Sequence, residues 1–480
     1  MNFDLNTIAK LSGQFGLPLH IYSKLAVRES ADGLRKIIER LYPYTQMCFA
    51  AKSNPCRGAI QLVSELGLGV DCVSEHELQT ALEEGIPADR IICNGNAKTD
   101  HYLSMIAEHS LLTAVDNMTE MEILDELASR RKSTTPILIR LSGMPLEGLT
   151  SADQTTAGAW TKFGFHFSEL EAVLDSLQSF QHLRFAGYSA HIGTQICSAD
   201  GYDRLMEYLF KASETATQMG LAVKHLNIGG GFPLNYLSEQ DWLELNDRLK
   251  KQLRGETPTD QWVTWENIPA GYAHLNGRKP TASDEWRGKA YWTAYPGAKM
   301  LERLLTKTHD DGKTTADKLR DMGAPKLIVE PGRALFSSAG ITVARVTAVK
   351  QVLGNNVIDL DMGIVNHSTN LVSPDMFPVE ILPHEPDEQP AEVFLAGRLC
   401  FTGDMIAKIK IKVNRLPNRG DLAVIKMTGA YSADHFASNS CGFPRPAKIA
   451  LDDVDRIEIW RQGEVFDDVF AEIKVVNLPE

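Results

Sequence analysis

Long apolar runs and a surplus of basic residues are both missing from this chain of 480 residues. No stretch of 18 apolar residues occurs, so the sequence contains no candidate transmembrane helix. Lysine and arginine total 49 against 62 aspartates and glutamates, which gives a formal charge of −13. Such a charge argues against general binding of nucleic acid or of an anionic membrane surface. These shortages leave a soluble globular protein, which the hydrophobic content of 43% also fits.

Cysteine is scarce and follows no framework. The seven cysteines are odd in number and scattered, with no Cys-x-x-Cys pair and no spacing typical of metal ligands. We therefore expect reduced thiols, no metal site and a cytoplasmic protein. The first 17 residues carry Asp4 and lack a continuous apolar core, so they do not look like a secretory signal.

Short apolar strands alternate with helical patterns through the first two thirds of the chain. The expected strands are residues 48–51, 70–73, 91–93, 112–115, 137–141, 185–191, 225–228 and 327–329. The alternation predicts βα units around a parallel sheet, and eight units are the number that closes a (β/α)8 barrel. An open doubly wound sheet is the alternative. We favour the barrel because candidate functional residues recur at several strand ends.

The remainder of the chain predicts a second, mostly β domain. We expect the barrel to span residues 24–333, and the β domain to comprise residues 334–480 with residues 1–23 returning to it as an edge strand. Residues 233–325 lie between the seventh and eighth strands. This segment is roughly three times as long as the usual loop and helix that connect two barrel strands. This insertion holds five of the seven tryptophans. It is predicted to shape the substrate entrance, with a dimer contact or a helix-packing element as the equal alternative.

One lysine follows a strand that reads as fully buried. Residues 47–51 are apolar, and Lys52 precedes a Ser-Asn-Pro sequence whose proline cannot continue a strand. Burial of the stem would lower the pKa of the amine and make it a nucleophile that forms a Schiff base with an aldehyde. The alternative is a lysine that extends from a strand end to water.

Three other strand ends carry polar residues. Asp71 precedes a helix, where it either caps the helix or orients Lys52. His191 ends an alternating strand and either stacks on a flat cofactor ring or is structural. Glu330 is suited to a protonated ring nitrogen, and Arg333 to a phosphate or carboxylate. A solvent-exposed strand end is the alternative for Glu330.

Three consecutive glycines, Gly229, Gly230 and Gly231, follow the strand at 225–228. Glycines let the backbone bend sharply and present neighbouring N–H groups to a phosphate. A tight turn without a ligand is the alternative. No Gly-Lys-Ser/Thr follows, so the motif is not a Walker loop.

Together these motifs resemble the fold-type III decarboxylases that use pyridoxal phosphate (PLP), which act on diaminopimelate, ornithine and arginine, and most closely the diaminopimelate branch. The resembling segments keep their order and spacing along most of the chain. They are residues 51–55, 69–78, 95–98, 162–164, 191–195, 229–231, 330–333, 400–404 and 429–431.

The resemblance implies an alanine-racemase-like (β/α)8 barrel with a mostly β domain, paired as a homodimer with shared active sites. It implies that Lys52 binds PLP, that Glu330 keeps the pyridine nitrogen protonated and that His191 stacks on the ring. The groups implied around the phosphate are Thr194, Gly229, Gly230, Gly231, Tyr431 and Arg333. Cys400 from the partner chain would protonate the carbanion after CO2 leaves.

The predicted substrate pocket departs from the diaminopimelate pattern. That branch has Cys-Glu-Ser-Gly-Asp where this chain has Cys400, Phe401, Thr402, Gly403 and Asp404. The glutamate recognises the distal ammonium, and phenylalanine cannot accept its hydrogen bond. The Arg-Pro segment that grips the distal carboxylate is also not recoverable in residues 361–370.

We therefore predict a decarboxylase for another amino acid or an amino-acid conjugate, for example from siderophore assembly. Its substrate would contact Arg333, Cys400, Phe401 and Asp404. The alternatives are diaminopimelate decarboxylase proper, an amino-acid racemase or epimerase of the same fold, and a non-catalytic PLP carrier. The presence of both Lys52 and Cys400 argues against the carrier.

Overall fold

The computed structural model describes residues 5–146, 155–268, 290–367, 376–435, 437–452 and 456–470. The chain divides into two compact units. The barrel unit comprises Ala26–Lys250 and Pro269–Ser337, and the β unit comprises Met1–Leu25, Lys251–Ile268 and Ser338–Glu480. Part of the predicted insertion, Lys251–Ile268, thus groups with the β unit.

Eight parallel strands close into the barrel that the sequence predicts. In barrel order they are β2 (Thr45–Ala50), β3 (Gly69–Cys72), β4 (Ile91–Cys93), β5 (Leu112–Val115), β6 (Thr135–Ser142), β8 (Leu183–Ser189), β9 (His225–Asn227) and β10 (Lys326–Val329). Pairing of β10 with β2 closes the ring, and β7 (Phe165–His166) adds a short pairing to β6. Each expected strand overlaps an observed one, so the barrel is confirmed.

Apolar side chains from different strands fill the barrel interior, as this fold requires. Cys48, Ile92 and Ile328 form one buried cluster. Ala114 and Leu138 belong to a second cluster, which shares Leu112 with the first. This packed layer leaves the strand ends as the place for polar side chains.

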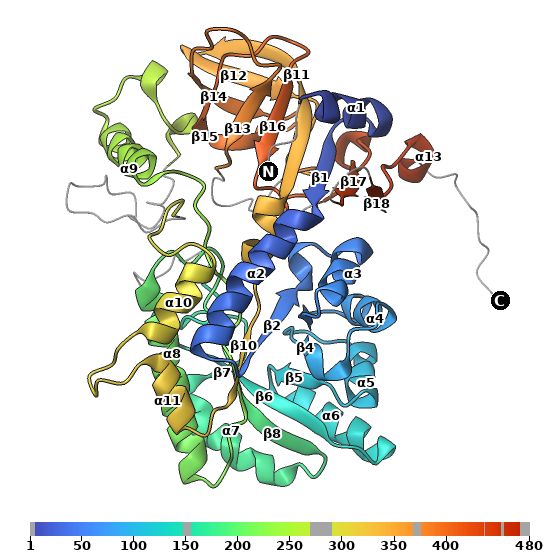
Figure 1. Cartoon of the computed structure of the whole chain (residues 1–480), viewed down its shortest axis with the longest axis vertical. Coiled ribbons are helices and arrows are strands. Elements are labelled where there is room, and N and C mark those ends of the chain that lie inside the picture. Colours follow the sequence, from blue (N-terminus) through green and yellow to red (C-terminus); the bar gives the residue numbers. More distant parts are fainter. Residues whose placement is uncertain are drawn as a thin grey trace, which may run out of the picture. The chain divides into compact units, whose positions relative to one another are not determined.

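Helices cover the outside of the barrel, and Figure 1 shows α3 to α6 following one another beside β4, β5 and β6. They are α2 (Lys24–Leu41), α3 (Arg57–Glu65), α4 (Glu75–Glu83), α5 (Asp100–Glu108), α6 (Met118–Arg131), α7 (Leu170–Ser176) and α8 (Ala199–Gln218). Side chains of Ser74, Thr99 and Asn117 accept hydrogen bonds from the first turns of α4, α5 and α6. Such caps satisfy N–H groups that a helix start leaves open.

The described insertion adds α9 (Glu239–Arg254), α10 (Ala298–Thr306) and α11 (Thr315–Asp321). Trp286 lies outside the described residues.

The β unit contains the N-terminal helix α1 (Leu5–Phe15), the C-terminal helix α13 (Phe466–Val469) and a nine-stranded sheet. Its strands are β1 (Leu19–Ser23), β11 (Gly340–Val352), β12 (Asn355–Leu360), β13 (Val379–Leu382), β14 (Ala391–Ala396), β15 (Met405–Val413), β16 (Leu422–Lys426), β17 (Ala447–Leu451) and β18 (Ile457–Arg461). The first segment does join the sheet, but as an internal strand, because β1 pairs with both β11 and β17. The expectation of an edge strand was therefore wrong. Strand β13 was not foreseen.

Within the described residues, no helix is long and apolar enough to cross a membrane. The same part of the chain holds no cluster of three or more potential metal ligands among His, Cys, Asp and Glu.

Candidate active site

Lys52 and Asp71 form an ion pair at adjacent strand ends. Lys52 lies in a 3-10 turn directly after β2, and its Nζ is 2.6 Å from Oδ2 of Asp71 on β3. The Asp71 side chain is fully buried, whereas the Lys52 side chain is 37% exposed. The Lys52 side chain is therefore partly buried, and the effect of a buried stem on the reactivity of the amine stays a prediction. The amine of Lys52 thus lies at the carboxyl ends of the barrel strands, paired with the buried carboxylate of Asp71.

Glu330 is the centre of a buried polar cluster. It follows β10, and its Oε1 accepts hydrogen bonds from Nδ2 of Asn94, at 2.7 Å, and from Nδ2 of Asn227, at 2.6 Å. No described residue donates a hydrogen bond to its Oε2. The protein thus holds one carboxylate oxygen of Glu330 and leaves the other for another donor.

The same amides connect Glu330 to the other predicted residues. Nδ2 of Asn94, which follows β4, also donates to Oδ1 of Asp71 at 2.7 Å. Oδ1 of Asn227, the last residue of β9, accepts the N–H of Gly229 at 2.9 Å. The sequence analysis did not single out either asparagine, although both end barrel strands, as the predicted residues do.

Burial raises the pKa of the Glu330 carboxyl to about 7. Its negative neighbour Asp71 raises the pKa further, while Lys52, the bond from Asn227 and Arg140 oppose the rise. Glu330 thus titrates near neutral pH in the protein without a ligand.

His191 packs against the glycine turn. Its Nδ1 accepts the N–H of Gly230 at 3.1 Å, so the proton of the neutral ring is on Nε2. Burial holds the pKa of His191 well below the usual value, and the positive charges of Arg140 and Lys52 add to this. The imidazole is therefore a neutral, flat surface at the end of β8.

The three glycines are required by close approaches. Gly229 and Gly231 have φ of +67° and +86°, in the left-handed region. A Cβ at Gly229 would lie 2.4 Å from His191 Nδ1, and one at Gly230 would lie 2.2 Å from the carbonyl oxygen of Glu330. Bonds to Asn227 and His191 already use the N–H groups of Gly229 and Gly230. Of the three glycine N–H groups, only that of Gly231 has no hydrogen-bond acceptor among the described residues. Fewer N–H groups are therefore available to a phosphate than the glycine run suggests.

Arg333 begins the short helix α12 (Arg333–Phe336) and is buried. It donates to the hydroxyl of Tyr236 at 2.6 Å and more weakly to Oγ1 of Thr194 at 3.4 Å. Tyr236 belongs to the insertion and had no signal in the sequence, because its place depends on how the insertion folds back.

Buried Gln195 links the start of the insertion to a later part of it. Its side-chain amide donates to the carbonyls of Leu234, at 2.6 Å, and Ala290, at 3.3 Å. The N–H of Tyr236 donates to the carbonyl of Tyr291 at 2.9 Å. These bonds attach residues 234–236 of the insertion to the segment after β8, and they hold Tyr236 beside Arg333.

Arg140 on β6 is a further residue near the site, besides Asn94, Asn227 and Tyr236, that was not predicted from the sequence. Burial lowers the pKa of its guanidinium, and the charges of Glu330, Asp116 and Asp71 oppose this change. It forms no ion pair with any residue that the structure describes. Arg140 therefore adds a positive charge near the carboxylates of the barrel.

The other four predicted site residues lie in the β unit. Cys400 is exposed. Phe401 is 61% exposed, and its ring lies over Gly403, where a Cβ would be 2.6 Å from Cζ. Tyr431 has a left-handed φ of +68° and a ring 5.7 Å from that of His435.

Asp404 is buried and serves the loops around it. Its two carboxylate oxygens accept the N–H groups of Ile364 and Leu399, each at 2.7 Å. Burial raises the pKa of Asp404, while these two bonds and Arg398 oppose the rise. If Asp404 contacted the substrate directly, it would do so through carboxylate oxygens that already accept backbone N–H groups.

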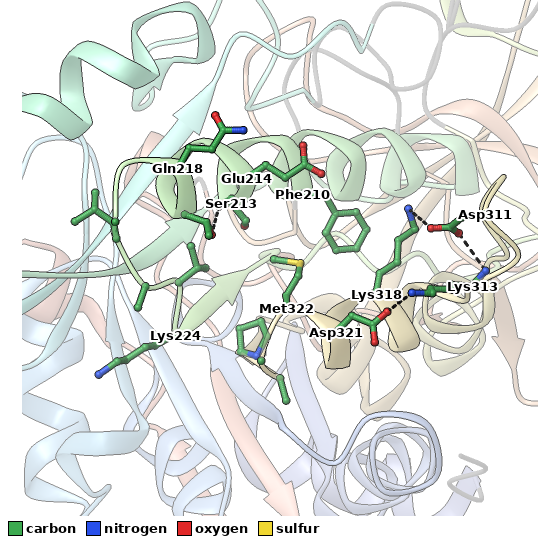
Figure 2. Close-up of a pocket in the computed structure, with 18 residues that line it drawn as sticks. Phe210, Ser213, Glu214, Gln218, Lys224, Asp311, Lys313, Lys318, Asp321 and Met322 are labelled. Atoms are coloured by element: carbon green, nitrogen blue, oxygen red, sulfur yellow. Dashed lines mark hydrogen bonds and ion pairs between the residues drawn. The ribbon is translucent and has the colours of Figure 1, made fainter.

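A hollow of about 1090 Å³ lies elsewhere on the barrel unit, between α8, α11 and the segments that enter β9 and β10 (Figure 2). Two lysines at its edge, Lys313 and Lys318, are paired with Asp321 and Asp311. The predicted barrel residues follow the strands, where barrel active sites lie, and none of them lines this hollow. The strand ends therefore remain the candidate site.

Comparison with known proteins identifies two matching family models. The pyridoxal-binding domain of pyridoxal-dependent decarboxylases matches residues 32–261, and their C-terminal sheet domain matches residues 152–429. Diaminopimelate decarboxylase of Bacillus subtilis is 25% identical over 96% of this chain and 92% of its own. The enzyme of that name from Synechocystis is 27% identical over 97% and 88%.

Solved structures show the same fold. Diaminopimelate decarboxylase of M. jannaschii with L-lysine has a TM-score of 0.76 and 20% identity, over 98% of this chain and 94% of that one. Lysine/ornithine decarboxylase of Vibrio vulnificus with putrescine has a TM-score of 0.66 and 20% identity, over 94% and 99%.

Proposed function

The chain belongs to the pyridoxal-dependent decarboxylases, and from this premise we propose that it releases CO2 from an amino acid or amino-acid conjugate other than diaminopimelate. The cofactor is pyridoxal phosphate, as in the family. When bound, it supplies an electron sink for the carbanion that decarboxylation leaves on Cα. The residue roles below are part of the proposal.

The barrel cluster fits this cofactor. The partly exposed amine of Lys52 is available to bind its aldehyde, and Asp71 orients that amine from 2.6 Å. Oε2 of Glu330 has no donor among the described residues and would accept a hydrogen bond from the protonated ring nitrogen, which keeps the proton on that nitrogen. The neutral imidazole of His191 offers a flat face for stacking. Each of these groups holds a different part of one ring.

The phosphate would be held by fewer backbone groups than the glycine run suggests. The N–H of Gly231, the hydroxyl of Thr194 and the guanidinium of Arg333 remain as donors, and the family resemblance adds Tyr431. Arg333 would also face the substrate carboxylate. Tyr236 fixes one end of that guanidinium through the 2.6 Å bond.

The observation that carries the substrate proposal is Phe401. Its exposed aromatic ring stands where diaminopimelate decarboxylases have the glutamate that binds the distal ammonium. A desolvated ammonium without an acceptor is costly, so we infer a substrate whose distal end lacks one at this point. Residues 368–370 of the segment that should carry the distal-carboxylate arginine lie outside the described residues.

Diaminopimelate decarboxylase proper is the second candidate. Eight relatives with that name match 88–97% of this chain, although identity is only 24–27%.

A substrate assay separates the two candidates. Purified protein saturated with PLP is offered diaminopimelate, lysine, ornithine and arginine, and CO2 release and amine formation are measured. We expect slow turnover of diaminopimelate in the wild type and a gain in Phe401→Glu. Fast turnover of diaminopimelate by the wild type would show that the substrate proposal is wrong.

We also infer a homodimer in which Cys400 of one chain donates a proton in the site of the other. The exposure of Cys400 in the single chain supports this. Lys52→Ala is expected to be inactive and Cys400→Ala to form little amine, and refolding them together should restore about a quarter of the wild-type rate of amine formation, because half of the dimers gain one intact site. No restoration in mixed dimers would place both residues of a site in one chain.

A further inference from the structure

Asn94 joins two carboxylates of the site through a single nitrogen. Its Nδ2 lies 2.7 Å from Oδ1 of Asp71 and 2.7 Å from Oε1 of Glu330. An amide NH2 group has two hydrogens, and both are used here. The N–H of Asn94 donates to the carbonyl of Cys72 at 2.8 Å, which fixes the residue between β3 and β4.

The orientation of this amide follows from charge. The alternative orientation would direct the carbonyl oxygen of Asn94 at two carboxylates, which is repulsive. In the observed orientation, Oδ1 is buried and has no hydrogen-bond partner in the described structure. A buried acceptor without a donor is uncommon in folded proteins and asks for an explanation. Delivery of both N–H groups to Asp71 and Glu330 supplies one.

We propose that Asn94 is a positioning residue that couples the Lys52–Asp71 pair to Glu330 and keeps the two carboxyl groups fixed and close together. The inference deepens the proposed function and rests on the roles given there to Lys52 and Glu330. Asn94 thus holds both Asp71, which orients the lysine for the cofactor aldehyde, and Glu330, which would bond the ring nitrogen.

Electrostatics explain why such a support is needed. Oδ1 of Asp71 and Oε1 of Glu330 can be no farther apart than twice 2.7 Å, so their charges repel. The charged or titratable groups that face Glu330 are Asp71, Lys52, Arg140 and the thiol of Cys48. Lys52 and Arg140 oppose the repulsion as cations. Asn94 opposes it by donating one bond to each carboxylate.

Loss of these bonds should move the acid limb of activity. Glu330 acts as a carboxylate, so activity falls when it takes up a proton. Without the bond from Asn94, the pKa of Glu330 rises and the fall occurs at higher pH. We expect Asn94→Ala to shift the acid limb of kcat/KM upward by about one pH unit, a tenfold loss at pH 6 and little loss at pH 8.

Two variants and one control test the proposal. Asn94→Ala removes the side chain, and Asn94→Asp keeps its shape but removes both N–H groups, so it answers the question if the alanine variant does not fold. Asn117→Ala is the control, because Asn117 follows the next strand and its side chain caps α6 by accepting the N–H of Glu120. Cofactor absorbance and kcat/KM are recorded between pH 5 and pH 9.

The readouts separate this proposal from the proposed function. Borohydride reduction and peptide mass spectrometry report whether the cofactor is on Lys52, and we expect it there in every variant. If the wild type fails this test, the proposed function is wrong. If all variants pass and the pH profiles of Asn94→Ala and Asn94→Asp match those of wild type or Asn117→Ala, the coupling by Asn94 is refuted.

Discussion

Replacement of Glu330 by glutamine should stabilise the cofactor-free protein while it removes activity. Glutamine keeps an oxygen that accepts from Asn94 and Asn227, but it carries no charge. The wild-type carboxyl is buried beside Asp71, which raises its pKa from 4.5 to about 7. A functional group that is costly to ionise thus reduces the stability of the protein that holds it.

The size and sign of this effect follow from proton linkage. Because the pKa is higher in the folded protein, the folded state binds the proton more tightly, and stability falls as pH rises from about 4.5 to about 7. At about 1.4 kcal/mol per pH unit, the loss reaches about 3 kcal/mol above pH 7. Glu330→Gln lacks this loss, so its advantage over wild type should be small at pH 5 and about 3 kcal/mol at pH 8.

Urea denaturation of both cofactor-free proteins between pH 5 and pH 8 measures this difference. Glu120→Gln is a matched control, because Glu120 is also buried but pairs with Lys98 at 2.8 Å, and the Lys98 side chain is fully buried. That variant should lose about 3–5 kcal/mol, since it leaves a buried ammonium without its carboxylate. A difference between Glu330→Gln and wild type that does not grow with pH would refute the reasoning.

Three further predictions follow from single contacts. Tyr236→Phe removes the hydroxyl that accepts from buried Arg333, so we expect a loss of about 1–2 kcal/mol in urea unfolding and weaker PLP binding by fluorescence titration; unchanged binding would remove Tyr236 from the site. Gly229→Ala should cost at least about 1 kcal/mol because φ is +67°, and should displace His191, which would appear as lost PLP affinity in a protein with normal circular dichroism. Cys400→Ala should retain PLP but yield less amine per CO2 released, and an unchanged yield by mass spectrometry would contradict its role as proton donor.

Much of the barrel could be predicted because its strands are short apolar runs that alternate with helical patterns. Lys52, Glu330 and Arg333 lie within four residues of the ends of such strands, so they could be proposed from the sequence without knowing how the barrel closes. A role for Asn94 could not be predicted in this way, because it follows a strand of only three residues and stands in an Asn-Gly-Asn sequence that is typical of a turn. Its role exists only because the closed barrel brings Asp71 and Glu330 within reach of one amide.

Other differences have equally local causes. The partial exposure of Lys52 arises because the chain leaves β2 in a 3-10 turn, which directs the side chain to Asp71 at the opening. β1 is internal because it pairs with β11 on one side and β17 on the other, and a sequence of five residues does not indicate how many neighbours a strand will have. Tyr236 could not be assigned, since its position depends on contacts between residues 195, 234 and 290.

The position of β1 has a consequence for synthesis. Leu19 pairs with Val343 on one side and with Ala447 on the other. At typical rates of translation, tens of seconds separate the emergence of the first strand from that of its second neighbour. Once the chain has emerged past Val329, all the barrel strands can assemble, whereas the mostly apolar segment Leu19 to Tyr22 still lacks β17 on one side. Aggregation of nascent chains truncated between residues 337 and 447 should therefore depend on the apolar residues of β1.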